Sequence, residues 1–95
     1  MAPIKFSELV FDHIVEFSKD HTIFAAAKNG DGHLRLFLIH EANGHVYTRN
    51  GRADSWEELF GADISTVIGC IAAARNRHIP VYRINGTNEE RPQAQ

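Results

Sequence analysis

Apolar and polar residues are patterned most clearly between residues 22 and 50, in three short runs separated by two glycine-marked turns. Asn43-Gly44 separates the second run from the third, and Asn-Gly best accepts the positive φ angles of a type I′ hairpin turn. Residues 29–32 mark the earlier turn, with either Asn29-Gly30 or Gly30-Asp31 as its central pair. The pattern therefore predicts an antiparallel meander of three strands, at residues 22–28, 33–41 and 45–49.

This meander predicts a sheet with two unlike faces, because side chains alternate with a period of two and both candidate turn registers differ by an even step. The face expected to pack on helices carries Ile23, Ala25, Ala27, Leu34, Leu36, Leu38, His40, Ala42, His45, Tyr47 and Arg49. The other face carries Phe24, Ala26, Phe37, Ile39 and Val46 among Lys28, His33, Arg35, Glu41 and Thr48.

The second face has too many large apolar residues for a surface turned to water. We expect it to be an interface, and its candidate residues are Phe24, Phe37, Ile39, Val46 and Arg35. Two alternatives leave it inside a monomer: the connection of residues 50–61, with Trp56 and Phe60, folds over it, or the first helix covers it.

Helical spacing predicts helices before and after the meander in the sequence. Apolar residues recur at steps of three and four over residues 6–17, which predicts an amphipathic helix with Ser7 as its N-cap. Residues 55–58 have capping-box spacing and predict a short helix that ends at Gly61. Asp63 suits the N-cap of a further helix, which ends near residues 75–78, where cationic side chains favour the helix dipole.

A fourth strand is predicted at residues 79–84. Pro80 has no N–H to donate, so it indicates either a strand at a sheet edge or a position at the start of the strand, and we expect an edge strand. The elements together predict an α+β fold of order α-β-β-β-α-β, with an antiparallel three-stranded meander plus an edge strand packed on two principal helices. Residues 1–84 form one domain, and residues 85–95 form a polar C-terminal tail without an apolar anchor.

Composition narrows the function classes only slightly. The net charge of −2 over 95 residues gives no general attraction to nucleic acid or to an anionic membrane. Cys70 is the single cysteine, so no internal disulfide forms, which suits a reducing compartment. Residues 1–10 lack the basic and then apolar segments of a secretory signal. We expect a cytoplasmic protein without membrane association.

The candidate chemistry lies in a polar cluster at the end of the sheet. Its residues are His40, His45, Tyr47 and Arg49. Two of its histidines are close by pairing, whereas a zinc site needs three or four ligands. We expect no resident metal, no cofactor and no catalytic residue. The alternative function is a small ligand- or metal-binding protein or enzyme that uses this cluster, with a small anionic molecule as one candidate ligand.

Six of the seven arginines lie from residue 49 onward, which gives a third hypothesis of nucleic-acid binding. An acidic row at residues 8, 12, 16 and 20 argues against it, because phosphate contacts supply most of such affinity. The leading hypothesis is a small accessory module that acts by non-covalent binding. We expect it to be a homodimer formed through the second sheet face or an edge strand.

Overall fold

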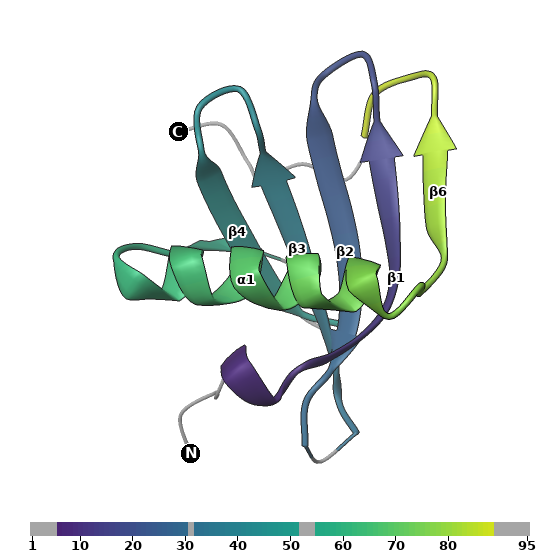
Figure 1. Cartoon of the computed structure of the whole chain (residues 1–95). Helices are drawn as coiled ribbons and strands as arrows, with labels where there is room; N and C mark the ends of the chain where they lie inside the picture. Colours follow the sequence, from purple (N-terminus) through teal and green to yellow (C-terminus); the bar gives the residue numbers. More distant parts are fainter. Residues whose placement is uncertain (1–5, 31, 52–54, 89–95) are drawn as a thin grey trace.

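The structure is a computed structural model that describes residues 6–30, 32–51 and 55–88. In these ranges, one α-helix crosses a face of a six-stranded mixed sheet of order β5-β4-β3-β2-β1-β6 (Figure 1). The strands are β1 (Val10–Phe17), β2 (Thr22–Lys28), β3 (Leu34–His40), β4 (His45–Asn50), β5 (Glu57–Glu58) and β6 (Val81–Ile84). The helices are the 3-10 helix η1 (Phe6–Glu8) and α1 (Ala62–Asn76). The predicted α+β class is confirmed.

The predicted meander is present as β2, β3 and β4, and β1 extends it by one more antiparallel strand. α1 runs across the strands from the β5 edge to the opposite edge, where β6 pairs with β1 in parallel (Figure 1). Pro80 directly precedes β6, and its carbonyl accepts a hydrogen bond from the Ile14 N–H. The edge position predicted from Pro80 is confirmed.

The predicted first helix is wrong, because most of its span is β1. Phe11 pairs with Ala27 and His13 with Ala26, so Asp12 is an extra residue in a β-bulge. The bulge brings Phe11 and Ile14 to the α1 side at a spacing of three residues instead of two or four. That spacing imitates the i, i+3 step of a helix, which explains the error.

The predicted short helix at residues 55–60 is also wrong. Glu57 and Glu58 form β5 on the outer edge of β4, and the Leu59 N–H donates to the Val46 carbonyl. Gly61 does not end a helix; it is the N-cap of α1 at φ 62° and ψ −136°. Asp63 lies in the first turn of α1 and makes no side-chain cap.

The register between β2 and β3 differs from the prediction by an odd step. Thr22 pairs with His40, and a connection of residues 29–33 joins the strands, closed by a hydrogen bond from the Asn29 N–H to the His33 carbonyl. An odd step moves one strand's side chains to the opposite face relative to its partner. The predicted division of the two faces is therefore wrong for β2 against β3. The turn between β3 and β4 comprises residues 41–44, so His40 pairs with His45. A two-residue turn at Asn43-Gly44 would instead pair His40 with Tyr47, and this even shift of two residues leaves the shared faces of the two strands unchanged.

The core lies between α1 and the sheet. Phe37 is fully buried at its centre, and its ring contacts Phe11 at 5.6 Å and Phe6 at 6.1 Å between centroids. Val67 and Ile71 face it from α1. The other members are Leu9, Ile14, Ile23, Ala25, Ala27, Ile39, Val46, Leu59 and Ala74.

The first residues of the predicted tail are held against the turn between β1 and β2. The Ser18 hydroxyl donates to Asn85 Oδ1 at 3.0 Å, and the Asn88 N–H donates to Asp20 Oδ2 at 3.0 Å. Asn88 is buried, so polar contacts replace the missing apolar anchor. The rest of the tail, residues 89–95, lies outside the described residues, as do residues 1–5, Asp31 and residues 52–54. Across the described ranges, no helix combines the length and apolar character required to span a bilayer.

Candidate functional site

The sheet face opposite α1, called the outer face below, is apolar across five strands. One row of paired residues crosses it. From β6 to β4 the row is Tyr82, Val15, Phe24, Leu38 and Tyr47. Side chains alternate along each strand, so these residues point away from the core that Phe37 and Ile39 share with α1.

Further apolar side chains extend this row toward the margins of the outer face. Val10 is 63% exposed, Leu34 43% and Ile84 45%, and Tyr82 in the row itself is 56% exposed. No helix or strand within the described residues lies over this face (Figure 1). Leu36 and Leu38 are nevertheless buried, although they do not belong to the core under α1. The exposed apolar side chains give the outer face the character of a contact surface, whereas its centre at Leu36 and Leu38 is already shielded from water.

The predicted interface residues do not share this face. Phe24 lies on the outer face and is half-buried. Phe37, Ile39 and Val46 belong to the core under α1, and Phe37 and Val46 have no exposed area. A partner can reach these two only by displacing the helix. The odd register step between β2 and β3 is the physical reason for this difference.

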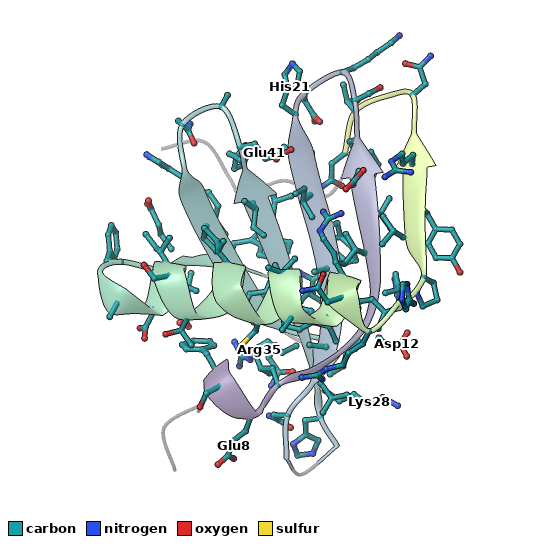
Figure 2. The ribbon with its side chains drawn as sticks, in the orientation of Figure 1. Glu8, Asp12, His21, Lys28, Arg35 and Glu41 are labelled. Carbon is teal, nitrogen blue, oxygen red and sulfur yellow. The ribbon has the colours of Figure 1, made fainter. Side chains whose placement is uncertain are left out.

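Arg35, the fifth predicted interface residue, also lies on the α1 side. It pairs with Ala27 and Asn50 at the end of the sheet opposite Glu41 (Figure 2). Its Nη1 donates to Thr48 Oγ1 at 3.3 Å, while its buried Nε has no hydrogen-bond partner among the described residues. Burial lowers the pKa of Arg35, and the nearby Glu57 carboxylate partly opposes that effect.

The predicted polar cluster is assembled on the outer face of β3 and β4. The His40 ring stands edge-on to Tyr47, with centroids 5.4 Å apart. His45 Nδ1 lies 3.4 Å from the Tyr47 hydroxyl and 3.2 Å from Glu58 Oε2. Arg49 lies apart from the two histidines and stacks on Trp56, at 5.1 Å from the ring centroid. The structure thus brings His40, His45 and Tyr47 together and adds Glu58 from β5.

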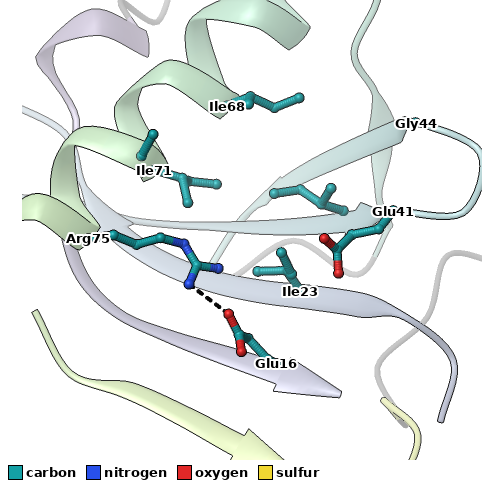
Figure 3. A pocket seen from close by; sticks show the side chains of 9 residues that line it. Glu16, Ile23, Glu41, Gly44, Ile68, Ile71 and Arg75 are labelled. Atoms are coloured by element: carbon teal, nitrogen blue, oxygen red, sulfur yellow. Dashed lines mark ion pairs between the residues drawn. The ribbon is translucent and has the colours of Figure 1, made fainter. Parts of the chain in front are cut away.

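The α1 side of the sheet has a pocket that the sequence did not indicate. It encloses about 490 Å³ between α1 and the ends of β1, β2 and β3 (Figure 3). Ile23 and Ile39 form its floor, and Ile68 and Ile71 form its helical wall. The pocket exists because α1 crosses the strands at an angle and leaves this end of the face open (Figure 1).

Glu16 is the best-anchored polar group of the pocket. Its Oε2 accepts from Arg75 Nη1 at 2.6 Å (Figure 3). Its Oε1 accepts from Arg83 Nε at 2.9 Å. These hydrogen bonds lower the pKa of Glu16, and the bond from Arg75 has the largest effect; burial opposes them. The sequence had placed Glu16 in the acidic row of a helix, and only the correct assignment of β1 would have turned it toward α1.

Glu41 provides a second carboxylate at the pocket. It directly follows β3, and its N–H donates to the His21 carbonyl at 3.0 Å. Both residues lie at the same end of the sheet (Figure 2). A neighbouring hollow is lined by Glu16, Glu41, His21 and Arg83, so the two carboxylates separate an apolar pocket from a polar one.

Other predicted features are dispersed. Arg75 and Arg83 meet at Glu16, whereas Arg49 lies on the outer face of β4, and Arg52 is outside the described residues. Within the described ranges, no three histidine, cysteine or acidic side chains are grouped to hold a metal ion.

The fold and these surfaces define a small α+β protein in which one helix crosses a mixed sheet, with an apolar outer face and a mixed pocket beside the helix. No protein-family model, curated protein or solved structure matches this chain.

Proposed function

We propose that the protein is an accessory module that acts by non-covalent association, and that two copies pair through their outer faces. The observation that carries the proposal is the apolar row from Tyr82 through Phe24 to Tyr47, together with the exposed apolar side chains at its margins. No described helix or strand lies over them, although Leu38 in the row is itself fully buried. Burial of such a row removes apolar area from water, at about 25 cal/mol per Å².

A second copy suits this surface because two apolar sheet faces pack well when they carry the same twist. A two-fold axis also presents the same residues to each other, so one self-complementary patch is enough. Glu58 borders the row at its β5 end, where it pairs with Tyr47 and lies 3.2 Å from His45 Nδ1. Other charged groups lie beyond the row. Lys28 is at the end of β2, and Arg49 stacks on Trp56, so pairing does not require burial of an isolated charge.

The test is the mass in solution, measured by light scattering on a sizing column. We expect twice the 10.7 kDa of one chain for the native protein. Leu34→Asp and Tyr82→Asp should lower the mass to that of one chain, because each inserts a carboxylate into the proposed contact. Both side chains are exposed, so the circular dichroism spectrum should remain native.

The matched control is Phe60→Asp, which changes a side chain that is 70% exposed and precedes α1, away from the outer face. This variant should keep the mass of the native protein. A native mass equal to one chain at every concentration would refute self-association. Equal dissociation of the Phe60→Asp variant would remove the outer face as its location.

A further inference from the structure

The pocket beside α1 combines an apolar surface with an open polar rim. Ile23 and Ile39 are buried in its floor, whereas Ile68 on its wall is about half exposed, at 47%. The short side chain of Ala72 leaves the pocket open on the helical side. A volume of about 490 Å³ lies within the range of about 300–1,000 Å³ typical of small-molecule sites.

The two carboxylates of the pocket differ in their partners. Glu16 is held by Arg75 and Arg83, so its charge is balanced inside the protein. The Glu41 side chain has no ion-pair or hydrogen-bond partner among the described residues, and its carboxylate is directed toward Ile23 (Figure 3). Two arginines thus meet Glu16, so the charges of Glu16, Glu41, Arg75 and Arg83 sum to zero. Of these four, Glu41 is the one whose side chain has no partner among the described residues.

We propose that this pocket binds a small primary aliphatic amine in its protonated form. The alkyl chain lies on Ile23 and Ile39, and the ammonium group donates a charge-assisted hydrogen bond to the Glu41 carboxylate. Arg75 holds Glu16 in place at the back of the pocket and keeps its carboxylate from competing for the ammonium.

Charge complementarity selects this class of ligand over its alternatives. A carboxylate or phosphate ligand would bring a second negative charge beside Glu41, and like charges repel at such distances. Arg75 and Arg83, the nearby cations, are already bound to Glu16. A neutral apolar ligand would cover the Glu41 carboxylate without giving it a partner, which is costly for a charged group. An alkylammonium ion satisfies both the apolar floor and the free carboxylate.

The experiment is a titration of the ¹⁵N-labelled full-length chain with hexylammonium, followed by amide NMR shifts. We expect saturable shifts that centre on Ile39, Glu41 and Ala72. Glu41→Gln should weaken binding about tenfold, because it removes the charge and keeps the shape. Glu57→Gln is the matched control on β5 and should leave the affinity unchanged. Hexan-1-ol and hexanoate, matched in chain length, should bind at least tenfold more weakly.

Equal binding of hexanoate or hexan-1-ol, or unchanged affinity in Glu41→Gln, would overturn the proposal. Tighter binding of the peptide acetyl-Leu-Lys-Leu-amide than of hexylammonium would also overturn it, since the site would then recognise a protein segment. The pocket lies on the face opposite the proposed dimer contact. Leu34→Asp should therefore bind hexylammonium as the native protein does, which separates failure of this proposal from failure of self-association.

Discussion

Replacement of Phe37 by alanine tests both the core and the register of the sheet. Phe37 lies between Ala25 and Thr48 on the α1 side, fully buried, with the rings of Phe6 and Phe11 against it. The register predicted from the turn would instead have placed this side chain on the opposite face. The cost of its removal therefore distinguishes the two arrangements.

The magnitude follows from the complete burial of the ring. Truncation of a buried phenylalanine to alanine costs about 3–5 kcal/mol, from the lost transfer free energy and the cavity that remains. The tilted and edge-on ring contacts each add a geometric contribution of about 0.5–1.5 kcal/mol beyond burial, so we expect a value near the upper end. For a domain of this size, about 4 kcal/mol corresponds to a fall in Tm of about 15–30 °C.

Urea unfolding followed by circular dichroism measures this change. The matched control is Phe24→Ala, because Phe24 is half-buried on the outer face and its truncation should cost about 1–2 kcal/mol. Both measurements should be made on the monomeric Leu34→Asp background, so that self-association does not contribute. If Phe24→Ala were as costly as Phe37→Ala, or costlier, the assignment of Phe37 to the core would be refuted.

Two further predictions concern Glu16 and the glycines of α1. Arg75 lowers the pKa of Glu16 below 4.5, so the unfolded chain binds more protons there; the stabilisation is present above pH 4.5 and is lost as the pH falls through the folded pKa. Glu16→Gln should therefore cost about 0.5–1 kcal/mol at pH 7 and progressively less as the pH falls below 4.5. A difference in urea midpoint that does not shrink on acidification would contradict the linkage. Gly61→Ala should destabilise the protein by about 1–3 kcal/mol, because Gly61 has a positive φ. Gly69→Ala should stabilise it by about 0.5–1 kcal/mol, because the added Cβ meets only open space on the helix. Melting temperatures that shift in the same direction in both variants would contradict this.

The sequence predicted elements well where periodicity was unbroken. α1 and β2 to β4 follow regular spacing over their lengths, and Pro80 marked β6 as an edge strand. β1 failed because one extra residue, Asp12, breaks its alternation, and a bulge cannot be told from a helical step without the partner strand. β5 failed because two residues are too few to show a period, and their pairing depends on the free edge of β4.

The pocket beside α1 depends on contacts that no local pattern encodes. Glu16 meets Arg75 and Arg83 only after β6 has returned to the edge of β1. The angle at which α1 crosses the sheet decides which end of the face stays open, and that angle results from packing. By contrast, His40, His45 and Tyr47 were predicted together because they belong to one hairpin, where an even register error does no harm.

An apolar face opposite the helix follows from β3 whichever register the sheet adopts. Its residues 36–39 are Leu, Phe, Leu and Ile, so large apolar side chains point to both faces of the sheet. A shift of the register by one residue would place Leu36 and Leu38 on the α1 side in place of Phe37 and Ile39, and both faces would remain apolar. α1 covers only one of them. The hypothesis of association therefore depends on the composition of β3, whereas the residues that mediate it depend on the length of the turn before it.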